Sequence, residues 1–190
     1  MKIVLASASP RRKELMEMLG VQNLEIIPAK GEEKAPKNVS PDELVKILSS
    51  QKAAEVAAMG HEKDIVIGAD TIVWAHGRVY GKPKSEAEAK EMLQSLSGNT
   101  HEVYTGVTVI NNGSVLSRSE CSVVTFRELD EREIDAYIAT KEPMDKAGAY
   151  GAQGKAALFV KSIDGDFFNV MGLPLCCLGE MLKEQGVVIL

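Results

Sequence analysis

The stretch IVLASASPRR, residues 3–12, decides the fold that the sequence predicts. Its first four residues are apolar and predict a short buried strand, while Ser9 followed by Pro10 is typical of a helix start. A strand therefore leads directly into a helix. Further apolar runs and helical patterns alternate along the rest of the chain, and this alternation predicts an α/β layer structure.

The predicted elements can be placed along the whole chain. Strands are expected over residues 2–6, 24–28, 64–74, 78–80, 101–111, 115–127 and 156–163, and helices over residues 10–20, 40–59, 85–97, 130–140 and 173–185. The sequence Asn-Asn-Gly-Ser at residues 111–114 is typical of a hairpin turn between two long strands. Hairpin strands are antiparallel, so the sheet is expected to be mixed.

Composition limits the classes of protein that the chain can belong to. It has 190 residues, of which 45% are hydrophobic and 26% charged, which predicts a single globular domain over residues 1–190. The net charge of −5 argues against general binding to nucleic acid or acidic membranes. No run approaches the ~18 apolar residues of a membrane span. The three cysteines indicate no disulfide framework, and we expect a cytoplasmic protein.

Two arginines occupy an unusual place in the first predicted helix. Arg11 and Arg12 lie in its first turn, where the helix dipole favours acidic residues. With the serine hydroxyls and the free backbone N–H groups of the helix start, they can form a cradle for an anion such as phosphate. The alternative is a solvated arginine pair on a surface helix.

A carboxylate interrupts the most apolar strand. Asp70 lies within IVIGADTIVW, residues 65–74, which reads as a strand buried on both faces. Burying a carboxylate is costly, so we expect Asp70 to act as a general base or to help hold a cation. A structural role is the alternative, in which Asp70 caps a bulge after Gly68.

Other charged residues carry weaker signals. Lys52 continues the row of Leu44 and Leu48 at four-residue spacing, so its ammonium emerges from the buried face of a helix or extends along it to solvent. Lys82 stands in a Gly-Lys-Pro sequence before the next helix. Glu33, in a run of alternating charges, is either solvated or part of a site.

The stretch DKAGAYGAQG, residues 145–154, combines three glycines with an amide side chain. Glycine allows close approach of the backbone, and the Gln153 amide can donate and accept hydrogen bonds at once, which suits reading the edge of a base. A glycine-rich surface turn is the alternative. The chain has neither a Walker loop nor a dinucleotide fingerprint, and it lacks a nucleophile elbow. Any chemistry is therefore expected to use activated water.

Together these motifs resemble the Maf family. The matching segments are Ser7-Ala8-Ser9-Pro10-Arg11-Arg12, Gly68-Ala69-Asp70-Thr71, Gly81-Lys82-Pro83, Leu96-Ser97-Gly98, residues 145–154 and Val170-Met171-Gly172-Leu173-Pro174. The resemblance implies an elongated mixed sheet flanked by helices, with two lobes around a cleft, similar to the inosine triphosphate pyrophosphatases. It also implies hydrolysis of a nucleoside triphosphate to the monophosphate and pyrophosphate with Mg²⁺ or Mn²⁺.

The resemblance also implies roles for individual residues. The catalytic aspartate of the family falls on Asp70, and its specificity positions fall on Arg12, Thr71 and Gln153. The remaining site positions fall on Ser9, Glu33, Lys52 and Lys82. Residues 145–154, paired with Ala-Asp-Thr at residues 69–71, resemble the branch that acts on dTTP and UTP.

These implications lead to one mechanistic hypothesis and to alternatives. We expect Arg11 or Arg12, with Lys52, Lys82 and the helix start near Ser9, to hold the triphosphate. A divalent cation is expected on Glu33, and Asp70 is either a second ligand or the acceptor of the proton from the attacking water. The alternatives are a nucleotide-dependent regulator of septum formation and the same chemistry on a modified nucleotide. A homodimer is a further expectation from the family.

Overall fold

The computed structural model describes residues 2–21, 23–32, 34–36 and 38–189. Its strands are β1 (Ile3–Leu5), β2 (Leu24–Ile26), β3 (Ile65–Ala75), β4 (Arg78–Tyr80), β5 (Thr100–Asn111), β6 (Ser114–Phe126) and β7 (Val160–Asp164). Its α-helices are α1 (Pro10–Met18), α2 (Pro41–Ala57), α3 (Glu86–Leu96), α4 (Glu131–Ala139), α5 (Phe167–Met171) and α6 (Leu175–Glu184).

Within the described residues the strands form one mixed sheet, and helices flank it. The strand order is β2-β1-β3-β5-β6-β7, with β4 paired to β3. β1 is parallel to both β2 and β3, whereas β4 is antiparallel to β3 and β7 is antiparallel to β6. The predicted mixed α/β fold is therefore confirmed.

The chain forms two compact units. The first contains Met1–Asp70, Thr105–Glu120 and Gly172–Leu190, and the second contains Thr71–Tyr104 and Cys121–Met171. β3, β5 and β6 each begin in one unit and end in the other. The expectation of one domain over residues 1–190 stays a prediction.

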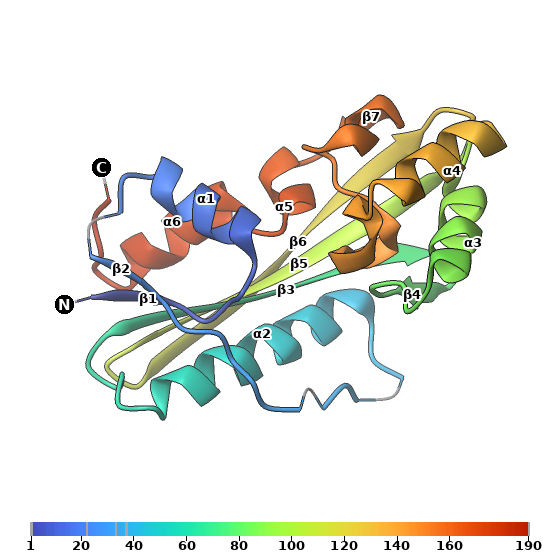
Figure 1. Cartoon of the computed structure of the whole chain (residues 1–190). Helices are drawn as coiled ribbons and strands as arrows, with labels where there is room; N and C mark the ends of the chain where they lie inside the picture. Colours follow the sequence, from blue (N-terminus) through green and yellow to red (C-terminus); the bar gives the residue numbers. More distant parts are fainter. Residues whose placement is uncertain (1, 22, 33, 37, 190) are drawn as a thin grey trace. The chain divides into compact units, whose positions relative to one another are not determined.

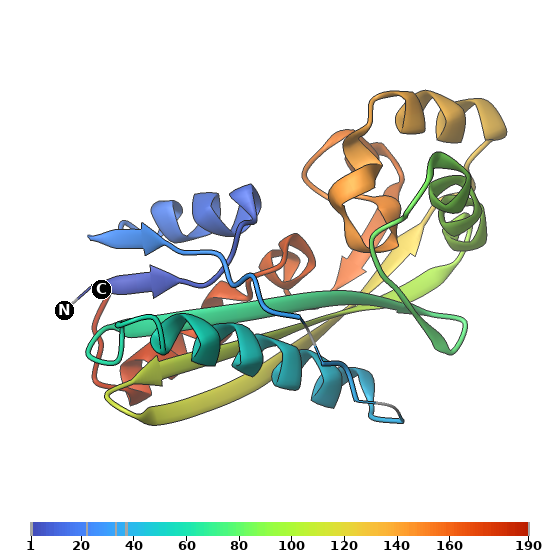
Figure 2. The same cartoon turned by 60° about the horizontal axis from the view of Figure 1, so that its bottom comes forward.

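In the first unit, helices cover both faces of the strands. α2 lies on one face, and α1 and α6 lie on the other (Figure 1). This follows from the strand order, because β1 to β2 and β2 to β3 run in opposite directions across the sheet, and right-handed crossovers then place α1 and α2 on opposite faces. Figure 2 shows α2 (teal) extending along the strands.

The sequence of α2 explains where the helix starts and which face it buries. Pro41 follows Ser40 at the N-terminus, and acidic residues in the first turn complement the helix dipole. The side chains that pack on the sheet recur at helical spacing, and they are Val45, Leu48, Ser49, Ala53 and Val56. Among them, the Ser49 hydroxyl lies 2.9 Å from the Thr108 hydroxyl of β5.

Two glycines bring α2 unusually close to the sheet. A Cβ atom on Gly68 of β3 would lie 2.8 Å from the backbone nitrogen of Ala53. A Cβ atom on Gly106 of β5 would lie 2.7 Å from the backbone nitrogen of Lys46. Such distances exclude any side chain, so these glycines set the height of the helix above the strands.

The second unit has its own core, in which aromatic rings gather. Phe126 makes edge-on contacts with His101 and Tyr150, at centroid distances of 5.1 and 4.8 Å. Phe159 continues the cluster and contacts Tyr137 of α4 at 5.1 Å. α3 and α4 complete this core with their buried apolar faces.

One predicted strand was wrong at its start, and one α-helix of the described residues was missed. Residues 156–163 were expected to be a strand, but Lys155–Leu158 form a 3₁₀ helix and β7 begins only at Val160. A turn that ends at Gly154 leads into this helix, and the Leu158 side chain is exposed. The apolar run therefore contains a change of direction that periodicity does not reveal. The short helix α5 was not predicted.

The buried histidine of this core makes stability dependent on pH. Burial lowers the pKa of His101 to about 4, below its ordinary value of 6.5. The unfolded chain therefore binds more protons between pH 6.5 and 4, and stability falls as the pH is lowered through this window. We expect chemical denaturation to show that the free energy of unfolding falls by up to about 1.4 kcal/mol for each pH unit in this window.

In a His101→Phe variant, the free energy of unfolding should depend less steeply on pH between pH 6.5 and 4.5. A His76→Gln variant serves as control, because His76 lies in an exposed turn. An unchanged slope in His101→Phe would assign the acid sensitivity to other groups.

Candidate active site

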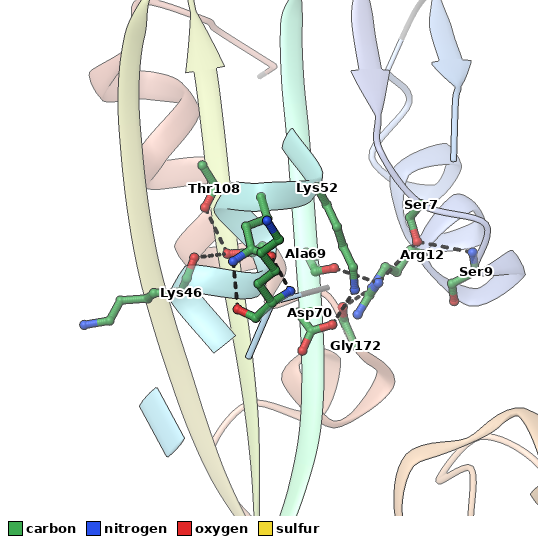
Figure 3. A network of polar contacts seen from close by, with 12 residues as sticks. Ser7, Ser9, Arg12, Lys46, Lys52, Ala69, Asp70, Thr108 and Gly172 are labelled. Carbon is green, nitrogen blue, oxygen red and sulfur yellow. Dashed lines mark hydrogen bonds and ion pairs between the residues drawn. The ribbon is translucent and has the colours of Figure 1, made fainter. Parts of the chain in front are cut away.

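Asp70 and Lys52 form an ion pair inside the first unit. Asp70 is only 8% exposed and lies on the same face of β3 as Gly68, toward α2. Lys52 of α2 donates a hydrogen bond from Nζ to Asp70 Oδ1 (Figure 3). Both side chains are largely buried. The strand and the helix therefore bring a carboxylate and an ammonium together, 18 residues apart in sequence.

This ion pair has consequences for binding. Two charges withdrawn from water stabilise each other, and removing one partner leaves the other poorly compensated. An incoming anion such as a phosphate can replace the carboxylate as the partner of the ammonium. The pair can therefore exchange a contact within the protein for a contact with substrate.

Arg12 anchors the start of α1 beside Asp70. Its Nε donates to the Gly172 carbonyl oxygen at 2.7 Å, and its Nη1 donates to the Ala69 carbonyl oxygen at 2.9 Å and to Ser7 Oγ at 3.2 Å (Figure 3). The guanidinium thus joins the segment after β1, the residue before Asp70, and the segment that leads into α6. Sequence reasoning gave Arg12 a role in binding substrate, and these contacts add a role in positioning β3.

α1 starts where the sequence predicts, but the capping hydrogen bond expected from the Ser9 side chain is not formed. Ser9 holds the N-cap position and Pro10 the first turn, yet the Ser9 side chain makes no capping hydrogen bond. Its backbone N–H donates instead to Ser7 Oγ at 3.2 Å. Arg11 is half-buried in the first turn, which contains no acidic residue.

The loop before α2 is fastened to that helix by two residues that sequence reasoning missed. Glu55 accepts hydrogen bonds from the backbone N–H groups of Lys30 and Gly31, at 2.7 and 3.0 Å. Gln51 exchanges two hydrogen bonds of 3.0 Å with the backbone of Lys34. No sequence signal identifies them, because their partners are backbone groups of a distant loop. The predicted metal ligand Glu33 lies outside the described residues.

The remaining predicted residues belong to the second unit. Thr71 directly follows Asp70 on β3 and is half-buried. Lys82 is exposed and lines a pocket of about 250 Å³ that also contains Arg78, Tyr80 and Lys84. Glu88 and Glu91 line the same pocket, so its three cationic side chains face a lining that also carries two carboxylates.

Gln153 occupies the third position of a tight turn. The Gly154 N–H donates to the Gly151 carbonyl oxygen at 3.0 Å, which closes the turn around Ala152 and Gln153. The Gln153 side chain is exposed. The same loop is joined to the Lys82 segment, because the Gly148 N–H donates to the Gly81 carbonyl oxygen at 3.1 Å. Lys82 and Gln153 are thus carried by connected loops.

Comparison with known proteins shows likeness over nearly the whole chain. The family model described as "Maf-like protein" matches residues 2–185. A protein of Bacillus cereus named dTTP/UTP pyrophosphatase is 55% identical over 186 residues, which cover 98% of this chain and 96% of that relative. A Bacillus cytotoxicus protein of the same name is 54% identical over 183 residues, covering 96% and 95% of the two chains.

Solved structures share the fold. The Ham1 protein of Staphylococcus aureus has a TM-score of 0.56 at 14% identity, and covers 97% of this chain and 100% of that chain. A HAM1 protein from Coxiella burnetii has a TM-score of 0.53 at 18% identity, with coverage of 97% and 99%. At these identities the likeness concerns the fold alone.

Proposed function

This chain belongs to the Maf family, and from that premise we propose that it hydrolyses dTTP and UTP to the monophosphate and pyrophosphate. The observation that carries the proposal is the buried pair of Asp70 and Lys52, next to the peptide held by Arg12. A carboxylate kept in a buried strand repels an anionic ligand, so simple binding of a nucleotide does not account for it. Accepting a proton from water does.

The chain's own basic residues supply the contacts to phosphate. Lys52 turns from Asp70 to a phosphate oxygen when the triphosphate binds, and this leaves the carboxylate able to accept a proton from water. Arg11, Lys82 and the start of α1 near Ser9 contribute further positive charge and N–H donors. The water attacks the α-phosphorus, and pyrophosphate leaves.

A divalent cation fits the donors that the chain offers. Asp70 supplies a hard oxygen ligand of the kind that Mg²⁺ and Mn²⁺ prefer, and Glu33 is the proposed second ligand. Over the described ranges no three candidate ligands gather, and Mg²⁺ needs only one or two carboxylates when substrate phosphates complete its coordination. When bound, the cation offsets negative charge on the phosphates.

Base selection is assigned to Gln153 and Thr71. Their amide and hydroxyl groups satisfy the carbonyl and N–H edge of uracil or thymine, and a cytosine or purine leaves polar groups unpaired. We expect Gln153→Glu to lower kcat/KM for dTTP and UTP by about tenfold to hundredfold, because an unpaired polar group costs about 1–3 kcal/mol. Turnover of purine nucleotides should change less.

The measurement is steady-state kinetics on dTTP, UTP, CTP, ATP and GTP. Gln94→Glu is the matched control, since Gln94 is an exposed glutamine of α3 in the same unit. Equal losses across all bases in Gln153→Glu would contradict the assignment.

Pyrophosphate release from a panel of nucleoside triphosphates, with Mg²⁺, with Mn²⁺ and with chelator, tests the proposed activity itself. Many turnovers on dTTP and UTP that need the cation are the expected result. Turnover confined to modified nucleotides would change the substrate but keep the chemistry. Stoichiometric binding without turnover would support the alternative of a nucleotide-dependent regulator.

The homodimer and the cytoplasmic location stay predictions. In the part of the chain that the structure describes, no helix is long and apolar enough to span a membrane.

A further inference from the structure

Side-chain hydrogen bonds hold the segment around Gln153 on both sides of its turn. Before the turn, the Tyr150 hydroxyl lies 2.7 Å from Nε2 of His101, and both residues are buried. After the turn, the Glu142 carboxylate accepts a hydrogen bond from the Lys155 backbone N–H, with a nitrogen-to-Oε1 distance of 3.1 Å. The exposed Gln153 side chain projects from the backbone between these two attachments.

Glu142 also lies directly against the backbone of the turn. A Cβ atom on Gly154 would overlap the Glu142 carboxylate, and one on Gly151 would lie 3.8 Å from Oε1. Gly151 and Gly154 are the first and last residues of the turn. The absence of a side chain at Gly154 therefore makes room for the Glu142 carboxylate, whereas the space beside Gly151 is taken by the Lys146 side chain, 2.6 Å from the position of such a Cβ atom. The carboxylate thus contacts the turn that carries Gln153.

Two neighbours hold Glu142 in place, one at its carboxylate and one at its backbone carbonyl group. The Tyr137 hydroxyl donates to Glu142 Oε1 at 3.1 Å, and Lys146 Nζ donates to the Glu142 carbonyl oxygen at 2.6 Å. Burial raises the pKa of Tyr137, and the charge of Glu142 raises it further, so the hydroxyl remains a donor. Tyr137 is buried on α4 and packs edge-on against Phe159. Glu142 is thus connected to the core of the second unit through Tyr137.

We propose that Glu142, oriented by Tyr137, is a positioning residue that sets base selection by holding the Gly151–Gly154 turn. It acts through Gln153 and does not itself contact the substrate. An amide distinguishes one base edge from another only while its donor and acceptor are held in place, and a displacement of about 1 Å can cost about 10²-fold in rate. The inference rests on the proposed function of Gln153.

The test compares kcat/KM for UTP with kcat/KM for CTP. We expect Glu142→Ala to lower this ratio about tenfold or more. Glu142→Gln should restore most of it, because the amide oxygen still accepts from the Lys155 N–H. Tyr137→Phe keeps the buried ring and removes only the hydroxyl, so it should cause a smaller loss in the same direction. Glu131→Ala is the control, since Glu131 is an exposed residue of α4 paired with Lys90.

A double-mutant cycle separates positioning from a merely structural role. If Glu142 acts through Gln153, Glu142→Ala should cause no further loss of the ratio in a Gln153→Ala background. Lower thermal stability with an unchanged UTP-to-CTP ratio in Glu142→Ala would overturn the inference, as would losses that multiply in the double variant. If Glu142→Ala does not fold, Tyr137→Phe and Glu142→Gln decide the question by the same ratio.

The failure of this inference can be told apart from the failure of the proposed function. A lower ratio in Gln153→Ala beside an unchanged ratio in every Glu142 and Tyr137 variant overturns the inference alone. An unchanged ratio in Gln153→Ala overturns base selection by Gln153 and the inference with it. A wild-type protein that hydrolyses no nucleotide overturns the proposed activity and both of these.

Discussion

Replacing Asp70 by asparagine should reduce turnover of dTTP and UTP by about 10²–10⁴-fold, the usual contribution of a positioned general base. Asparagine is nearly the same size as aspartate but accepts protons poorly. Its carbonyl oxygen can still accept a hydrogen bond from Lys52, which limits the cost of leaving that ammonium in a buried place. The fold should therefore survive, and circular dichroism and thermal unfolding will show whether it does.

Asp64→Asn is the matched control for this experiment. Asp64 directly precedes β3, and its carboxylate interacts with His61 at 3.0 Å and with the Lys2 backbone N–H at 3.3 Å. Its neutralisation should lower stability modestly and leave turnover intact. Near-normal turnover in Asp70→Asn would show that Asp70 is not the base.

A binding measurement distinguishes the two proposed roles of Asp70. If Asp70 is only the base, Asp70→Asn should bind a non-hydrolysable UTP analogue with the same dependence on Mn²⁺ as the wild type. If Asp70 is chiefly a metal ligand, the effect of Mn²⁺ on affinity should be lost. Isothermal titration calorimetry with and without Mn²⁺ gives the answer directly.

The second large effect is expected at Gly68, two residues before Asp70. In Gly68→Ala the new methyl group meets the backbone of α2 at Ser49 and Ala53, and backbone cannot turn aside as a flexible side chain can. We expect a loss of about 3 kcal/mol or more in the free energy of unfolding. Because α2 carries Lys52, lifting the helix also separates the ammonium from Asp70, so activity should fall as well.

Gly179→Ala is the control for a glycine-to-alanine change, and we expect it to raise stability where Gly68→Ala lowers it. Gly179 lies inside α6, and a Cβ atom there would have nothing within 4 Å. Alanine has a higher helix propensity than glycine, so this variant should gain about 0.5–1 kcal/mol. Urea denaturation of both variants makes the comparison, and equal stability of Gly68→Ala and the wild type would show that α2 does not press on β3 as described.

Local patterns in the sequence were enough to place most helices and strands. α2 was expected over residues 40–59 and spans Pro41–Ala57, and the hairpin at residues 111–114 joins β5 to β6. These features depend on neighbours a few positions apart, such as the proline that starts a helix or the glycine of a turn. The strand predicted over residues 156–163 was wrong at its start because local patterns were not enough there. The change of direction in this apolar run depends on contacts that are distant in sequence.

The sequence by itself also determined that Asp70 stands in a buried strand, since most of the residues around it along the chain are apolar. Only the tertiary structure decided which groups these charged side chains contact. Lys52 meets Asp70 because two glycines let α2 lie close to the sheet, and Arg12 reaches the carbonyl oxygen of Gly172, 160 residues away. The Glu142 carboxylate occupies space left by Gly154. Nearly every residue offers the same backbone N–H and C=O groups, so residue type does not reveal which of them a side chain will bind. A sequence can therefore identify the charged residues of a site without showing which groups they contact.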